Sequence, residues 1–303
     1  MSFETTATIA NFGGKLLKLA HQVRSKPTLP SGETIADRPP QSKSTNCQMK
    51  LNLYLPPNAS TSSPVPMLFY LAGLTCTGDN CAEKGFFQAR AAHHNMAIVY
   101  PDTSPRGLGI QGEDESYDFG SGAGFYVDAI RKPWSDGYKM YSYITKELPE
   151  ALTSSFKELD GKRMSITGHS MGGHGALTLF LKNPGLYKST SAFAPVCNPS
   201  NCPWGEKAFK GYFGEDAKDQ WAAHDATELL KSYDGETDIL IDVGTGDNFY
   251  KQGQLLPENF EKVAKDKGKK VDVRYREGYD HSYFFISTFA GDHVDHAAKY
   301  LCK

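Results

Sequence analysis

A serine within a glycine-rich turn is the strongest chemical signal in this sequence. Residues 168–172 read Gly-His-Ser-Met-Gly, a match to the Gly-x-Ser-x-Gly pattern. A β-prone segment, 163–167, precedes the match, and an apolar segment with helical character, 173–181, follows it. A tight turn between a strand and a helix exposes such a serine as a nucleophile. Ser170 could instead be an ordinary helix N-cap, but the flanking pattern favours the nucleophile.

A serine hydroxyl is a weak nucleophile, so this prediction also requires a general base and a carboxylate that orients it. Asp247 follows the predicted strand 239–243 in a glycine-flanked loop, and His281 follows the predicted strand 271–275. The order serine, acid, histidine, with each residue beyond a strand end, is that of the α/β-hydrolase fold. We therefore predict that Ser170, Asp247 and His281 form a catalytic triad.

Other acids and histidines fit these roles less well. Asp242 lies inside its predicted strand and Asp238 precedes it, while His293 and His296 lie well within a predicted C-terminal helix. Taken alone, Asp247 or His281 could equally be a structural loop residue. Their joint placement in the right order favours the triad.

Acyl transfer also needs backbone N–H groups that stabilise the developing oxyanion. The residue after the nucleophile, Met171, supplies one such group in this fold. The second comes from a loop after an earlier strand, here residues 72–77 after the apolar strand 67–71. Within that loop we assign the N–H of Leu74, since Gly73 lets the backbone turn inward.

Alternating strand and helix patterns predict one α/β domain over residues 1–303, with a mostly parallel central sheet and helices on both faces. Residues 1–46 are expected to form an N-terminal extension with early strands. Residues 48–55 alternate polar and apolar side chains, which predicts a strand with one wet face. The remaining strands are expected at 67–71, 96–100, 163–167, 191–194, 239–243 and 271–275. Helices are expected at 83–95, 140–156, 173–181, 219–232, 257–267 and 282–300.

The composition argues against several function classes. The formal net charge is −2 and the isoelectric point about 6.5, which suggests neither a nucleic-acid nor a membrane partner. The N-terminus has no signal-peptide pattern, and no segment approaches the ~18 apolar residues of a membrane span. The six cysteines follow no C-x-x-C spacing, so we expect no metal site on them. Without an export signal, we expect them to be reduced thiols.

With these residues in place, the chain resembles the S-formylglutathione hydrolases, the esterase D family, from about residue 49 to residue 301. The resemblance rests on several segments beside the serine motif. They are 74–77, 120–129, 168–177, 203–205, 247–249, 254–260 and 279–285. Residues 26–46 are longer and more polar than this family leads us to expect.

The resemblance implies a cytoplasmic, often dimeric hydrolase without a cofactor, which cleaves S-formylglutathione to glutathione and formate in formaldehyde detoxification. It also implies activity on short-chain esters. Cys76 matches a thiol-sensitive position near the family's active site, and Trp204 matches a position expected to line the pocket. Two alternatives stay open: a broad carboxylesterase with a different physiological substrate, and a catalytically silent binding protein with a hydrolase fold.

Overall fold

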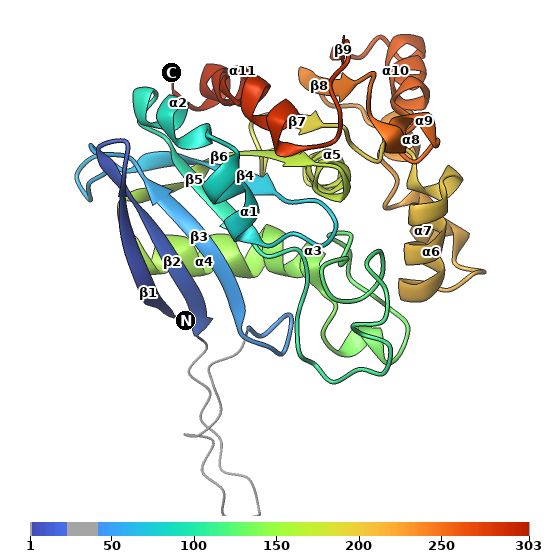
Figure 1. Ribbon diagram of the computed structural model, residues 1–303, viewed down its shortest axis with the longest axis horizontal. Helices are drawn as coiled ribbons and strands as arrows, with labels where there is room; N and C mark the ends of the chain where they lie inside the picture. Colours follow the sequence, from blue (N-terminus) through green and yellow to red (C-terminus); the bar gives the residue numbers. More distant parts are fainter. Residues whose placement is uncertain (1, 23–41, 303) are drawn as a thin grey trace, which may run out of the picture.

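The computed structural model describes residues 2–22 and 42–302. Their centre is one nine-stranded sheet with the order β1-β2-β3-β5-β4-β6-β7-β8-β9 (Figure 1). The strands are β1 (Ser2–Asn11), β2 (Gly14–Gln22), β3 (Met49–Leu55), β4 (Val65–Leu71), β5 (Ala97–Pro101), β6 (Leu159–His169), β7 (Thr190–Phe193), β8 (Ile239–Gly244) and β9 (Val271–Arg276).

The sheet has a parallel part and an antiparallel part. Strands β5, β4, β6, β7, β8 and β9 are parallel to one another, whereas β1, β2 and β3 form an antiparallel meander that joins the edge at β5. Every residue of β4 is buried, as expected for an interior strand with helices on both faces. The predicted α/β fold with a mostly parallel sheet is confirmed.

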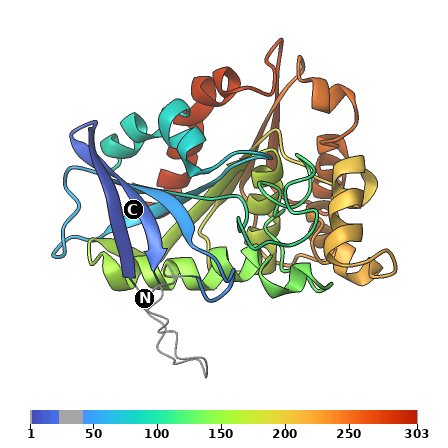
Figure 2. The ribbon, with the colours of Figure 1, turned by 60° about the horizontal axis from the view of Figure 1, so that its bottom comes forward.

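Helices cover the two faces of the sheet. Helices α1, α2 and α11 lie on one face, and α4 lies on the other (Figure 2). The α-helices are α1 (Gly78–Lys84), α2 (Phe87–His93), α3 (Met140–Ser142), α4 (Leu148–Ser155), α5 (Met171–Lys182), α6 (Pro203–Tyr212), α7 (Lys218–Ala222), α8 (Ala226–Lys231), α9 (Asn248–Lys251), α10 (Pro257–Asp266) and α11 (Tyr283–Leu301). Shorter or irregular turns are η2 (Trp134–Asp136), η3 (Tyr143–Glu147) and η4 (Pro199–Asn201). Among the described residues, no helix combines the length and the apolar character that a bilayer crossing requires.

Three local predictions are wrong. The helix expected at 219–232 is two helices, α7 and α8, because the chain leaves the helical path at 223–225 and the Asp225 side chain caps the start of α8. The single helix expected at 83–95 is two helices, α1 and α2, because Gly85 ends the first and Phe86 adopts a left-handed conformation with φ +57°. The wet face expected for 48–55 is absent from β3, where Lys50 alone is exposed. Asn52 is buried instead, and its amide donates to Asp79 of α1 at 2.9 Å.

The polar stretch noted at 26–46 lies mostly outside the described residues, from 26 to 41. Its last part, 42–46, forms a turn around the buried carboxylate of Glu147. That carboxylate accepts hydrogen bonds from the Ser42 hydroxyl and from the N–H groups of Lys43 and Ser44. The turn is thereby fixed to the end of η3, on the approach to β3.

Candidate active site

The serine turn between β6 and α5 has the backbone strain of a nucleophile elbow. Ser170 has φ +58° and ψ −119°, a conformation that a residue with a Cβ adopts only when its surroundings impose it. Its N–H donates to the carbonyl of Phe193 in β7 at 2.9 Å. A Cβ at Gly168 would lie 2.2 Å from the carbonyl oxygen of Gly172, and one at Gly172 would lie 2.0 Å from that of Leu71. Glycine is therefore required at both positions.

Asp247 and His281 are hydrogen-bonded to each other. His281 Nδ1 lies 2.5 Å from Asp247 Oδ2. The other carboxylate oxygen, Oδ1, accepts the N–H of Phe249 at 2.7 Å, so that Asp247 also caps α9. Asp247 is fully buried. The carboxylate fixes the proton of the imidazole on Nδ1, which leaves Nε2 free to accept one.

Ser170 and His281 line one cavity of about 250 Å³. The imidazole of His281 is in contact with that of His169, the neighbour of Ser170, with ring centroids 4.3 Å apart. Among the residues described, no hydrogen bond joins the serine hydroxyl to His281; such bonds often tighten only once substrate is bound. The cavity is lined by Gly73, Leu74, Thr75, Cys76, Tyr117, His169, Ser170, Trp204, Phe249, His281 and Tyr283.

The two N–H groups assigned to the oxyanion hole are available. Met171 is the first residue of α5, where N–H groups have no acceptor within the helix. Leu74 lies in the loop beside the serine, since a Cβ on Gly73 would come within 3.1 Å of Ser170 Cβ. Within ranges 2–22 and 42–302, neither N–H donates to another protein group. The loop itself is held by Thr75 N–H, which donates to the carbonyl of Gly122 at 2.9 Å.

Burial sets the charge states of the side chains around the serine. Burial, and to a lesser extent the nearby His281, hold the pKa of His169 well below its ordinary value. Burial also raises the pKa of the Cys76 thiol and of the Tyr283 hydroxyl. These three groups are therefore neutral near pH 7, and the cavity wall carries no fixed charge from them.

Cys76 and Trp204, the pocket residues implied by the family resemblance, both line this cavity. Sequence reasoning did not assign the three other aromatic residues of the wall, Tyr117, Phe249 and Tyr283. The Trp204 indole N–H donates to the Tyr117 hydroxyl at 3.2 Å, which joins α6 to a loop 87 residues earlier. Phe249 and Tyr283 each lie two residues after a predicted triad member. That proximity in sequence could have indicated that both residues line the cavity.

Asp242, predicted from the sequence to be a poorer triad acid than Asp247, lies in a different environment from Asp247. It is fully buried in β8, where it accepts from Arg274 at 2.9 Å, from Arg276 at 2.7 Å and from His293 Nε2 at 2.9 Å. Hydrogen bonds from His293 and Arg274 outweigh the effect of burial and lower the pKa of Asp242 to about 2. His293 stacks on Phe193, with ring centroids 3.6 Å apart. Asp242 thus holds the His293 ring, which packs against Phe193 at the end of β7.

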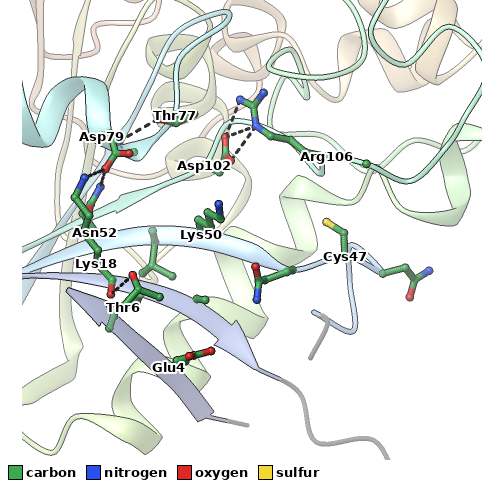
Figure 3. Close-up of a pocket in the computed structure, with 17 residues that line it drawn as sticks. Glu4, Thr6, Lys18, Cys47, Lys50, Asn52, Thr77, Asp79, Asp102 and Arg106 are labelled. Atoms are coloured by element: carbon green, nitrogen blue, oxygen red, sulfur yellow. Dashed lines mark hydrogen bonds and ion pairs between the residues drawn. The ribbon is translucent and has the colours of Figure 1, made fainter. Parts of the chain in front are cut away.

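A second cavity, of about 900 Å³, opens over the antiparallel strands (Figure 3). Four of its six charged side chains form two ion pairs: Arg106 with Asp102 at 3.0 Å and Lys18 with Asp79 at 2.9 Å. None of the predicted triad lines it. Size alone therefore does not decide between the two cavities, because the smaller one holds the predicted nucleophile and the predicted base.

In the part of the chain that the structure describes, no group of three or more His, Cys, Asp or Glu side chains is placed to hold a metal ion. The arrangement around Ser170 consists of its hydroxyl, an imidazole, a carboxylate and two N–H donors. These groups are sufficient for acyl transfer.

Comparisons with known proteins identify relatives of this chain. Residues 42–296 match the family model "Putative esterase". S-formylglutathione hydrolase of Rattus norvegicus is 55% identical over 256 residues, which are 84% of this chain and 90% of that protein. The enzyme of the same name from Arabidopsis thaliana is 50% identical over 261 residues, 86% of this chain and 91% of that protein. The solved S-formylglutathione hydrolase of Agrobacterium tumefaciens has a TM-score of 0.88 and 40% identity, and the match covers 99% of this chain and 100% of that one.

Proposed function

The chain belongs to the S-formylglutathione hydrolase family of esterases, and from that membership we propose that it hydrolyses S-formylglutathione to glutathione and formate. The observation that carries the mechanism is the hydrogen bond between Asp247 and His281, in a cavity that also contains Ser170 in its strained turn. Family membership names the substrate. The cavity supplies the groups that its hydrolysis requires.

Acylation begins when the Ser170 hydroxyl attacks the formyl carbon. Nε2 of His281 takes the hydroxyl proton, and Asp247 stabilises the imidazolium that forms. The carbonyl oxygen becomes an oxyanion and accepts from the N–H groups of Leu74 and Met171. Loss of one such donor costs ~3 kcal/mol of transition-state stabilisation in hydrolases where it has been removed. Glutathione leaves as a thiol, and its sulfur receives the proton from His281.

Deacylation repeats the same steps with water. His281 removes a proton from water, and the hydroxide attacks the formyl ester of Ser170. The second oxyanion collapses, the C–O bond to the serine breaks, and the product leaves as formic acid, which loses its proton to solvent to give formate. The proton on His281 returns to the Ser170 oxygen, so that the enzyme ends the cycle as it began.

The cavity suits a small acyl group with a good leaving group. About 250 Å³ bounded by Trp204, Phe249 and Tyr283 leaves room for a formyl or short acyl group beside the serine. A thiolate departs more readily than an alkoxide, so acid assistance from His281 matters less for thioesters than for oxygen esters. Hydrolysis of a thioester at this site therefore requires less acid assistance from His281 than hydrolysis of an oxygen ester.

The remaining properties that the family resemblance implied are part of the same proposal. We place the protein in the cytoplasm as a homodimer that needs no cofactor, with a role in formaldehyde detoxification. The cations near the cavity do not single out a glutathione carboxylate partner. Arg106 is paired with Asp102, Lys207 with Asp118, and Lys251 donates to the carbonyl of Gly246.

The decisive experiment compares kcat/KM for S-formylglutathione and for p-nitrophenyl acetate. We expect a clear preference for the thioester, and loss of both activities by several orders of magnitude in Ser170→Ala. Ser287→Ala, which removes an exposed hydroxyl on α11, is the matched control and should retain wild-type turnover. Circular dichroism checks that both variants are folded.

Each alternative predicts a different result. A preference for the simple ester would identify a broad carboxylesterase with another physiological substrate. A silent binding protein would show no turnover of either compound and no labelling of Ser170 by a fluorophosphonate. Wild-type turnover in Ser170→Ala would refute the mechanism itself.

A further inference from the structure

Lys182, the last residue of α5, has an unusual partner for a lysine. Its Nζ lies 2.8 Å from Nε2 of His224 and 5.0 Å from the centre of the Tyr141 ring. The side chain is half-buried between these two groups. Twelve residues of helix separate it from Ser170, a distance of about 18 Å along the axis. The Lys182 cluster, defined as Lys182, His224 and Tyr141, is thus separate from the active site.

The hydrogen bonds of His224 fix which of its nitrogens carries a proton. Nδ1 lies 2.8 Å from the carbonyl oxygen of Gln220, and because a carbonyl only accepts, Nδ1 carries the hydrogen. Burial and the nearby Lys182 lower the pKa of His224 to about 4, so the ring is neutral near pH 7. Its Nε2 therefore presents a lone pair to the amine of Lys182.

Burial favours the uncharged form of the amine, while the Tyr141 ring attracts the ammonium form. Burial lowers the pKa of Lys182 to about 8, against a smaller opposing effect of Asp128. On its own helix the nearest titratable group is His174, which is itself neutral because burial lowers its pKa to about 3. Among the residues that the structure describes, no carboxylate lies within ion-pair distance of Lys182. Near pH 7.5 about a quarter of the amine is unprotonated, against about 0.1% for an ordinary exposed lysine.

We propose that Lys182 is an acylation site, at which the amine takes the formyl group of a thioester such as S-formylglutathione. An amine beside a hydrogen-bonded base has the arrangement of an activated nucleophile. The natural donor in this proposal rests on the function proposed above. The site itself rests only on the cluster, and any soluble thioester or activated ester of a small acid serves as a probe.

The reaction is an aminolysis that balances without a further reagent. The lone pair of Lys182 Nζ attacks the acyl carbon and forms a C–N bond. His224 Nε2 accepts one proton from the nitrogen, the C–S bond breaks, and glutathione leaves as a thiolate. The thiolate then receives the proton by way of solvent. The products are an amide at Lys182 and free glutathione.

The test uses full-length Ser170→Ala, in which the donor is not consumed by turnover. The protein is incubated separately with S-formylglutathione and with p-nitrophenyl acetate at pH 7.5, and peptide mass spectrometry measures initial labelling of each lysine. We expect labelling of Lys182 at least tenfold faster than that of Lys188, an exposed lysine that follows the same helix. Lys182→Arg should remove that label and leave the label on Lys188 unchanged.

Two further measurements distinguish an amine of raised nucleophilicity from one that is only accessible to the reagent. The labelling rate at Lys182 should be half-maximal near pH 8 and should reach a plateau at higher pH. The labelling rate of an ordinary lysine should instead keep rising up to about pH 10. His224→Gln keeps a hydrogen-bond acceptor but removes the base, and should slow labelling of Lys182 at least fivefold. Labelling of Lys188 in that variant is the internal control.

Equal labelling of Lys182 and Lys188 by both reagents overturns the proposal. So does a labelling rate at Lys182 that still rises steeply at pH 9.5. A different result isolates the function proposed above: if wild-type protein fails to hydrolyse S-formylglutathione while p-nitrophenyl acetate still labels Lys182 selectively, the substrate assignment fails and the acylation site stands.

Discussion

The imidazole of His169 packs against that of His281, with ring centroids 4.3 Å apart. His169 is only 6% exposed, and burial keeps its pKa well below the ordinary value. A neutral ring in this position shields one face of His281 without adding a competing charge. We therefore expect His169 to position the predicted base.

Replacement of His169 separates packing from proton transfer. His169→Phe keeps a neutral ring, so we expect kcat/KM within about fivefold of wild type and an unchanged acid limb in the pH–rate profile. His169→Lys places an amine against His281 and should lower kcat/KM far more. Loss or displacement of the acid limb in His169→Phe would show that His169 itself exchanges the catalytic proton.

Asp247→Asn should lower kcat by about 10⁴-fold, the effect of the equivalent change in serine proteases, because an amide no longer fixes the Nδ1–H tautomer of His281. The asparagine oxygen can still accept from Phe249 N–H, so the cap of α9 and the fold should persist. Asp280→Asn, at an exposed carboxylate bonded to Ser282, is the matched control. Near-wild-type kcat in Asp247→Asn would remove Asp247 from the mechanism.

Alkylation of Cys76 should block the reaction by filling the cavity. Burial raises the pKa of this thiol, so we expect slow reaction with iodoacetamide at pH 7. Cys76→Ser should keep kcat/KM within about tenfold of wild type and resist the reagent. Cys302 is exposed, and Cys302→Ser should leave the inhibition unchanged. If Cys76→Ser is as inactive as Ser170→Ala, the thiol has a chemical role.

Acid should destabilise the fold through buried histidines. Burial lowers the pKa of His174 to about 3, against about 6.5 in an unfolded chain. The unfolded state therefore binds more protons between these values, and the resulting stability is complete above pH 6.5 and is lost as pH falls toward 3. From pH 7 to pH 5 the contribution of His174 to the free energy of unfolding falls by about 2 kcal/mol. Urea unfolding at both pH values measures the change.

The comparison variant for this prediction is His174→Gln, whose amide can still donate to the carbonyl of Phe125, the present partner of Nε2. It should be less stable at pH 7 but lose less stability on acidification. His93→Gln, at an exposed position, should retain the wild-type difference. An unchanged difference in His174→Gln would contradict the assignment to this residue.

Two glycines in helices should respond in opposite ways to alanine. A Cβ at Gly291 in α11 meets nothing within 4 Å, so Gly291→Ala should raise the free energy of unfolding by about 0.5–1 kcal/mol. A Cβ at Gly175 in α5 would lie 2.6 Å from the Tyr126 ring, so Gly175→Ala should destabilise. Thermal unfolding of both variants provides the measurement; a lower Tm for Gly291→Ala would be the contrary result.

The seven strands predicted from residue 48 onward follow from short-range patterns and recur in the structure with shifts at their ends. The sequence also placed Ser170, Asp247 and His281 beyond strand ends, because that argument needs only element order. Whether these residues catalyse remains a prediction.

Features that depend on contacts between residues distant in sequence could not be predicted from the sequence. The role of Asp242 depends on the pairing of β8 with β9, which brings Arg274 and Arg276 alongside it. The buried face of β3 depends on α1, which supplies Asp79 to the buried amide of Asn52. Alternation within one strand cannot reveal a partner on a later helix, and for that reason the wet face was predicted wrongly.

The alignment of the parallel strands carries a consequence for refolding. Gly168 pairs with Ala192, and Ala192 with Ile241, while Gly244 pairs with Arg276. A slip of one residue in any of these ladders would shift the attached loop by about 3.3 Å and turn its side chains to the opposite face. Recovery of turnover after denaturation therefore indicates that four strands have paired in the correct register. Measurements of compactness or helix content alone would not reveal that register.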